Sequence, residues 1–175
     1  MNFLGLSGSL RAASTNSALL GVMREYAPEG CTLSIYDGLG RLPVFNPDDE
    51  QRPGAEVLRL TAMVVAADGL IIACPEYAHG VPGGLKNALD WLVSGEAAIG
   101  KPAMLVHASP RSRISRAALR EILKTMSFDV LDGEEVEIAL LGKKPEDVAA
   151  ILARLDTRRH LQTALERFRR FVTSN

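Results

Sequence analysis

The sequence has few aromatic residues, few cysteines and no long apolar run. Phe, Trp and Tyr make up 5% of its 175 residues, so the core has to be built mainly from Leu, Val, Ile and Ala. Its two cysteines, Cys31 and Cys74, belong to no C-x-x-C pair, which argues against a disulfide framework and a zinc site. No stretch approaches the roughly 20 apolar residues that a membrane-spanning helix needs. These absences favour an ordinary globular domain.

A block of charge of one sign is missing as well. The sequence has 20 Lys and Arg and 21 Asp and Glu, for a formal net charge of −1. Proteins that bind nucleic acid or anionic membranes usually carry a basic patch, so neither partner is expected. The first residues, MNFLGLSG, have no basic segment and only a short apolar run, unlike a secretory signal peptide. We therefore expect a cytoplasmic protein.

What the sequence does contain is an alternation of short apolar runs and longer segments with helical periodicity. The runs predict strands at Asn2–Leu6, Thr32–Tyr36, Gly69–Cys74 and Pro102–His107, with a weaker fifth at Asp129–Leu131 or Glu135–Ala139. The segments predict helices at about Ser17–Tyr26, Ala55–Ala67, Gly84–Val93 and Ser115–Met126, and a final helix from Pro145 toward Phe171.

Strands that are apolar on both faces are typical of a parallel sheet covered by helices on both sides. Five such strands in a chain of this length suit an open sheet better than a barrel, which needs roughly 250 residues. We therefore predict that residues 1–175 form a single α/β domain. Its fold would be flavodoxin-like, a three-layer sandwich around a five-stranded parallel sheet in the order 2-1-3-4-5.

The loop after the first strand, LSGSLRAASTNS, gathers hydrogen-bond donors at the start of a helix, where unpaired N–H groups and a partial positive charge favour an anion. Its glycine spacing does not match G-x-G-x-x-G, and no lysine completes a Walker loop. Asp37 imitates a ribose-binding acid, but without those glycines it carries little weight. We predict a phosphate site rather than a merely capped turn. Its side chains would be Ser9, Arg11, Ser14, Asn16 and Ser17.

The loop after the third strand, PEYAHGVPGGLKNALDWL, is stiffened by Pro75 and Pro82 and contains three glycines that allow close approach of the backbone. Together with the aromatic face of Tyr77, such a loop suits a flat heteroaromatic ring. Glu76 serves equally well as a ring contact, a helix cap or an ion-pair partner. The three histidines form no set of metal ligands, and no serine lies in a G-x-S-x-G turn.

GSLRAASTN (Gly8–Asn16) and PEYAHGVPGGLKNALDW (Pro75–Trp91) together resemble the NAD(P)H-dependent FMN reductase family, which includes quinone, azo-dye and chromate reductases. LPVFNPDDE (Leu42–Glu50) is also similar to the family's loop after the second strand, and the resemblance extends from Asn2 to about Leu123. It implies noncovalently bound FMN, NADPH or NADH as the electron donor, and a homodimer or homotetramer.

By this resemblance the phosphate would be held by Ser9, Arg11, Ser14, Asn16 and Ser17, and the isoalloxazine ring would be bordered by Pro75, Glu76, Tyr77, the backbone of Ala78 and Ser109. Two departures stand out. The family usually has Asn where this sequence has Ala78. Its fourth loop usually reads S-P-x-G-x-x-G-G-x-R, whereas SPRSRISRAALR contains no glycine. Arg111, Arg113 and Arg116 either recruit an anion, such as a phosphate of NADPH, or crowd the ring.

The implied activity is a ping-pong hydride transfer from NAD(P)H through FMN to a small acceptor, which is a quinone, an azo compound, a metal oxyanion or free flavin. Because the hard chemistry belongs to the cofactor, no side chain is expected to act as acid, base or nucleophile. The alternative is a flavodoxin-like domain with weak or lost flavin binding that acts as a sensor or redox partner. The glycine-free fourth loop supports this alternative.

Overall fold

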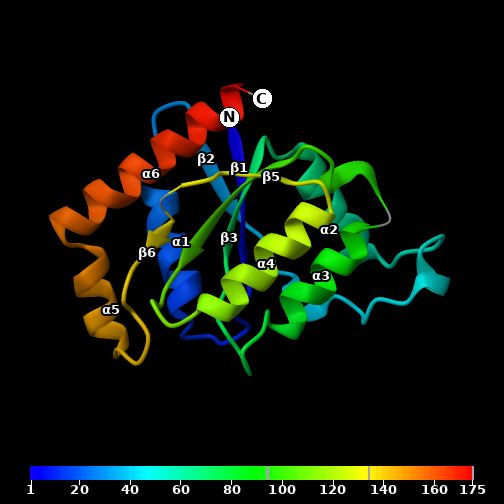
Figure 1. Ribbon diagram of the computed structural model, residues 1–175, viewed down its shortest axis with the longest axis horizontal. Helices are drawn as coiled ribbons and strands as arrows, with labels where there is room; N and C mark the ends of the chain where they lie inside the picture. The colour runs from blue at the N-terminus through cyan, green and yellow to red at the C-terminus, as the bar shows by residue number, and fades with distance from the viewer. Residues whose placement is uncertain (94, 134, 175) are drawn as a thin grey trace.

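A computed structural model describes residues 1–93, 95–133 and 135–174. One parallel sheet lies between two layers of helices (Figure 1), with the strand order β2-β1-β3-β4-β5 and with β6 also paired to β4. The predicted α/β fold and strand order are therefore confirmed. The strands are β1 (Asn2–Ser7), β2 (Thr32–Ile35), β3 (Gly69–Ala73), β4 (Pro102–His107), β5 (Asp129–Val130) and β6 (Val136–Glu137).

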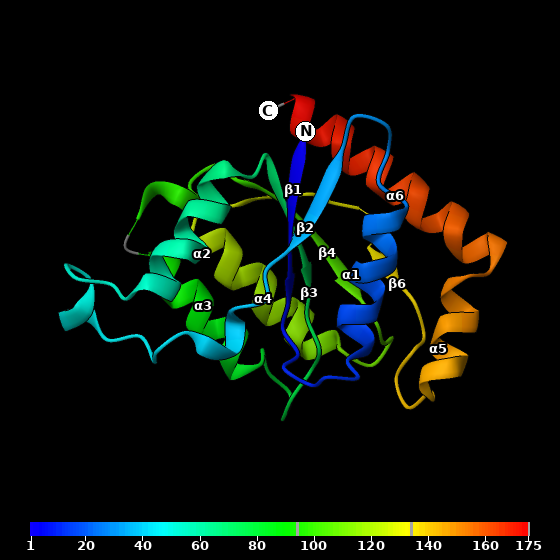
Figure 2. The same cartoon turned by 180° about the vertical axis from the view of Figure 1, so that it is seen from behind.

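The helices divide between the two faces of the sheet (Figure 2). One face carries α1 (Thr15–Glu25), α5 (Pro145–Leu152) and α6 (Leu155–Ser174). The other carries α2 (Ala55–Ala66), α3 (Gly83–Val93) and α4 (Arg113–Thr125). Short 3₁₀ turns are η1 (Leu39–Arg41), η2 (Pro47–Asp49) and η3 (Glu96–Ala98). No helix in the described ranges is long and apolar enough to cross a membrane.

Burial on both faces explains why the strands read as unbroken apolar runs. Every residue of β3 and β4 is buried. In β1, Leu4 and Leu6 belong to the core beneath α2, α3 and α4. Phe3, which precedes Leu4, belongs to the opposite core, where its ring lies 5.0 Å from that of Phe168 on α6. The buried apolar residues of the strands therefore pack against one helical layer or the other.

The last part of the chain differs from the prediction in two ways. Both candidate fifth strands form: β5 pairs with the start of β4 and β6 with its end. The prediction of a single final helix is wrong, because the chain turns at Ala153 between α5 and α6. Asp156 fixes this turn, since its carboxylate accepts from Thr157 N at 2.8 Å and pairs with Arg154 at 2.7 Å. The turn lets α5 and α6 pack against the same core.

Candidate functional site

The loops that follow β1, β3 and β4 leave the same end of the sheet, because these strands are parallel (Figure 2). A cavity of about 160 Å³ there is lined by Asn16 on α1, Pro75 and Tyr77 after β3, and Ser109 after β4, among others. A larger hollow of about 410 Å³ is lined by Leu10, Arg11, Tyr77 and the start of α3. Tyr77 lines both, and its side chain is exposed.

The first and third loops are joined directly. Gly8 N donates to the carbonyl of Ala73 at 2.8 Å. A Cβ at Gly8 would lie 3.0 Å from Pro75 Cδ and 3.1 Å from Leu85 Cδ2, so only glycine fits without a shift of its neighbours. The hydroxyls of Ser9 and Tyr77 lie 3.3 Å apart. The predicted phosphate loop and the predicted ring loop therefore form one continuous wall.

Serines fix the start of α1. Ser14 is its N-cap, and the Ser14 hydroxyl accepts from Ser17 N at 3.2 Å. The Ser17 hydroxyl lies 2.8 Å from that of Ser7, at the end of β1. The helix begins two residues earlier than the expected Ser17. These hydroxyls shape the loop, and each can still donate or accept a further bond.

Two polar side chains near the start of α1, Asn16 and Arg11, have groups without a hydrogen bond or ion pair to the residues that the structure describes. Asn16 is 6% exposed, yet its Oδ1 has no hydrogen-bond partner within the described ranges. An unpaired buried carboxamide costs stability unless a ligand satisfies it. Arg11 is exposed and lines the larger hollow rather than the cavity that Asn16 lines. The two therefore line different cavities, and Tyr77 lines both.

Glu76 ties the third loop to α4. Its Oε2 accepts from Ile114 N and Ser115 N, both at 2.9 Å, and its Oε1 lies 3.2 Å from His79 Nδ1. These contacts, with the Ser115 N–H as the largest cause, lower the pKa of the Glu76 carboxyl. Of the alternatives that the sequence left open for this side chain, the structure contains the helix cap and a contact with His79, and Glu76 also lines the smaller cavity.

The turn after Tyr77 is tight and strained. Tyr77 and Gly80 exchange both backbone hydrogen bonds, at 3.1 and 2.9 Å. Between them Ala78 has φ +48° and His79 φ +58°, a left-handed conformation that Gly and Asn tolerate better than Ala. The departure from the family's usual Asn at Ala78 therefore removes a residue suited to this backbone.

The three arginines in and after the fourth loop differ in their contacts. Arg116 points inward and donates to the carbonyl of Ser109 at 2.6 Å, so the expectation that all three recruit an anion or crowd the ring is wrong for this residue. Arg111 and Arg113 are exposed and form no ion pair in the part of the chain that the structure describes. Arg111 lines the smaller cavity beside Ser109.

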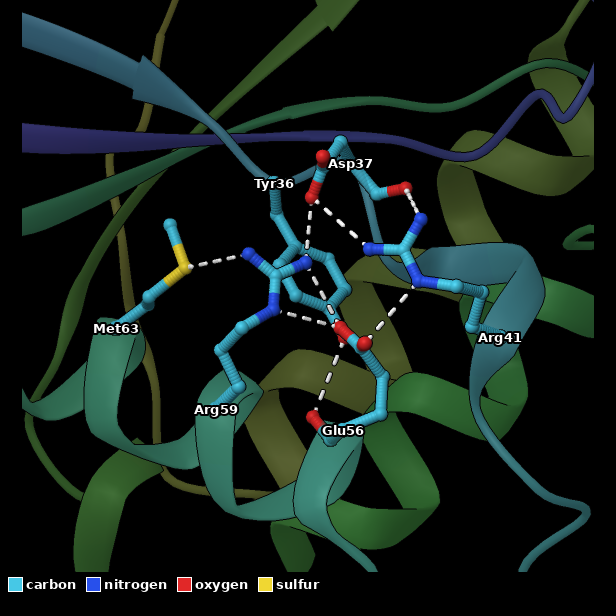
Figure 3. Close-up of polar contacts among 6 residues, drawn as sticks. All are labelled: Tyr36, Asp37, Arg41, Glu56, Arg59 and Met63. Atoms are coloured by element: carbon cyan, nitrogen blue, oxygen red, sulfur yellow. Dashed lines mark hydrogen bonds and ion pairs between the residues drawn. The ribbon is translucent and has the colours of Figure 1, made fainter.

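Asp37 takes no part in either cavity. Figure 3 shows it in a polar cluster that ties the end of β2 and η1 to α2, paired with Arg41 at 3.2 Å and with Arg59. These arginines hold the pKa of the Asp37 carboxyl below its usual value, Arg59 more than Arg41. Tyr36 donates to Glu56 Oε1 at 2.8 Å, and burial, followed by Glu56, raises the pKa of its phenol.

Some residues that line the smaller cavity were not predicted. Thr15 lies between predicted residues and could have been found by its place at the helix start. Leu141 comes from the segment after β6, far along the chain, and nothing in the sequence points to it. Cys74 also lines this cavity, but burial raises the pKa of its thiol to about 12, so it is no nucleophile at neutral pH.

Comparison with known proteins covers the whole site. The family model described as NADPH-dependent FMN reductase matches residues 1–140. A quinone reductase from Escherichia coli K12 is 31% identical over 175 residues, which cover 95% of this chain and 93% of that protein. A subunit of the NADH:(hydroxy)cinnamate reductase from Vibrio ruber is 36% identical over 127 residues. That match covers 70% of this chain and 62% of the subunit, less than two thirds of its length.

Among solved structures, the flavoenzyme NAD(P)H:(acceptor) oxidoreductase FerB from Paracoccus denitrificans superposes with a TM-score of 0.85 at 25% identity. The superposition covers 99% of this chain and 97% of that one. The similarity therefore includes α5 and α6, beyond the residues that the family model matches.

Proposed function

The chain belongs to the NADPH-dependent FMN reductase family, and on that premise we propose that it transfers electrons from NAD(P)H through FMN to a quinone. The observation that carries the proposal is the meeting of Asn16, Tyr77 and Ser109, from three separate loops, around one cavity. A quinone is chosen among acceptors because two relatives named for quinones, the quinone reductase and a 2-hydroxy-1,4-benzoquinone reductase from Burkholderia sp, are similar over 93% and 92% of their lengths. A flavin reductase subunit from Lactobacillus johnsonii is similar over 97% of its length, so free flavin is the second acceptor to test.

The first loop would hold the phosphate and the chain next to it. Asn16 supports this assignment most strongly, because its buried oxygen has no partner within the described residues and can accept from a ribityl hydroxyl. The exposed guanidinium of Arg11 is suited to a phosphate oxygen. The hydroxyls of Ser9, Ser14 and Ser17 supply the remaining donors, and the N-terminus of α1 adds its partial positive charge.

The third and fourth loops would border the ring. Pro75, Tyr77 and Ser109 line the smaller cavity, and the Tyr77–Gly80 turn brings the backbone of Ala78 to the same end of the sheet. Glu76 also lines the cavity, and it braces this wall against α4. The hollow of about 410 Å³ that Tyr77 also lines lies within the roughly 300–1,000 Å³ typical of ligand sites. Arg11 lines it as well, so this hollow would take the phosphate that Arg11 binds.

When bound, FMN would supply the hydride chemistry. The chain contributes binding, orientation and hydrogen-bond donors. The exposed Arg111 beside the cavity is suited to an anionic donor and favours NADPH over NADH. Cys74 stays protonated and takes no part.

Steady-state kinetics test the proposal. With the FMN-loaded protein, NADPH and benzoquinone, double-reciprocal plots at several quinone concentrations should give parallel lines, as a ping-pong scheme requires. Intersecting lines would contradict it. Comparison of kcat/KM for benzoquinone, an azo dye, chromate and free FMN should rank the quinone first. A higher value for one of the others would replace the quinone as acceptor.

We also propose that the protein is a homodimer or homotetramer. Light scattering of the purified FMN-loaded protein at several concentrations measures its mass directly. A mass close to the 18.9 kDa of a single chain at every concentration would contradict the proposal.

A further inference from the structure

The fourth loop, residues 109–112, keeps its shape through side chains. No glycine occurs between Ser109 and Arg120. Instead, the buried Ser112 hydroxyl donates to the carbonyl of Ser109 at 2.9 Å, and the Ser109 hydroxyl accepts from Arg111 N at 3.1 Å. Both contacts fold the chain back on itself just before α4 begins. The loop is therefore shaped by hydrogen bonds to Ser109, which lines the smaller cavity.

Arg116, on the first turn of α4, reaches the same carbonyl from inside the molecule. Its Nη2 donates to Ser109 O at 2.6 Å and lies 2.7 Å from Glu137 Oε2 on β6. The side chain is only 15% exposed. A guanidinium withdrawn from water has to be paired. This one is paired with the Glu137 carboxylate on β6 and with the Ser109 carbonyl in the cavity wall. One side chain thus fixes Ser109 relative to the edge of the sheet.

The segment that leads into β6 is fixed by ion pairs as well. Glu135, just before β6, has one carboxylate oxygen 2.8 Å from Nε2 of the fully buried His107 and the other 2.6 Å from Arg120. Arg116 Nη1 lies 3.8 Å from the first of these oxygens. The contact with His107, followed by that with Arg120, lowers the pKa of the Glu135 carboxyl to about 2. Glu135 is therefore an anion at neutral pH and joins β4, α4 and the approach to β6.

We propose that Arg116 is a positioning residue of the flavin site, which sets the wall formed by Ser109 by holding its carbonyl against Glu137. The inference rests on the proposed function, because its subject is the binding of FMN. Arg116 does not line the cavity itself and acts through residues that do, mainly Ser109 and, by a 3.4 Å contact of its Nε with the hydroxyl, Ser112.

The test compares two arginines of α4 that share a carboxylate. Arg116→Met keeps the aliphatic stem and removes every donor. It should raise the Kd for FMN roughly tenfold, the loss typical of one hydrogen bond from a charged group. The matched control is Arg120→Met, one turn further along α4. It loses the ion pairs with Glu135 and Asp132 but touches nothing in the cavity wall, so its Kd should stay unchanged. Quenching of FMN fluorescence on titration measures each Kd.

Two further variants separate positioning from general loss of stability. Arg116→Lys keeps the charge, but its single ammonium lacks the planar fork of donors, so its Kd should fall between those of wild type and Arg116→Met. Ser112→Ala removes the other donor to the Ser109 carbonyl and should weaken FMN binding in the same direction. It keeps the question open to measurement if Arg116→Met does not fold. Thermal unfolding of each apoprotein shows whether the changes in Kd follow stability.

Equal losses of affinity in Arg116→Met and Arg120→Met would overturn the inference, because the effect would then belong to the ion-pair network as a whole. Unchanged affinity in both Arg116→Met and Ser112→Ala, with wild type binding FMN, would overturn it alone and leave the proposed function standing. A wild-type protein without affinity for FMN would overturn both.

Discussion

The loops after β1 and β4 both contribute residues to the candidate site, and they use their polar groups in opposite ways. The first loop leaves a buried oxygen on Asn16 and a guanidinium on Arg11 without partners in the described ranges. In the fourth loop the Ser109 carbonyl takes two donors, and Arg116 is committed to it. Unused groups at a cavity point to a ligand, whereas saturated groups give it a rigid wall.

Arg11→Met should have the largest effect on the Kd for FMN. It removes an exposed charge assigned to the phosphate, and the loss of a charge-assisted contact should raise the Kd for FMN roughly 10- to 100-fold. Because the Arg11 side chain has no partner among the described residues, the apoprotein's melting temperature should not change. Arg113→Met, another exposed arginine, is the control, and its Kd should equal that of wild type. An unchanged Kd in Arg11→Met would remove the residue from the phosphate site.

Asn16→Leu should weaken FMN binding and at the same time stabilise the apoprotein. Replacing an unpaired buried carboxamide with an apolar side chain of similar size should stabilise the apoprotein by about 1 kcal/mol. The same change should weaken FMN binding about tenfold, because the ligand loses its partner. Chemical denaturation of the apoprotein and FMN titration measure the two effects. A destabilised apoprotein would mean that Asn16 already has a partner in the fold.

Ala78→Asn tests whether the turn beside the cavity stores strain. Ala78 adopts φ +48°, and asparagine tolerates this conformation better, so the variant should be more stable by about 1 kcal/mol. Ala13→Asn, at an exposed loop position without positive φ, is the control and should not gain stability. Thermal melting measures both, and a loss of stability in Ala78→Asn would contradict the strain.

Asp37→Asn should have the smallest effect. Asp37 is exposed, and neither it nor its ion-pair partners Arg41 and Arg59 (Figure 3) are among the residues that line the two cavities. Exposed ion pairs contribute little, and this one touches no wall of the site. FMN titration should therefore give the wild-type Kd, and a weakened affinity would place the cluster in the site after all.

Most of the fold could be predicted, because strands buried on both faces are recognisable in the sequence as apolar runs. The fifth strand was ambiguous since β5 and β6 are two residues each and take their place from β4 rather than from a pattern of their own. The turn at Ala153 was missed because neither glycine nor proline marks it. Asp156 is the signal that was present, as a carboxylate able to cap a new helix.

The candidate residues were easiest to predict where they are neighbours in sequence. The first and third loops each contain their candidates within a short stretch. Arg116 reads as one of three surface arginines, because the partners that draw it inward, Glu137 and the Ser109 carbonyl, come from other elements. The same limit applies to Leu141, which reaches the cavity only through the path of the chain after β6.

The most direct test of the proposed function is whether the purified protein retains FMN. After incubation with FMN and desalting, the protein should show a visible flavin spectrum that bleaches on anaerobic addition of NADPH and returns when a quinone is added. Loss of all flavin on desalting, with no affinity on titration, would contradict the proposed function and leave the fold without its cofactor.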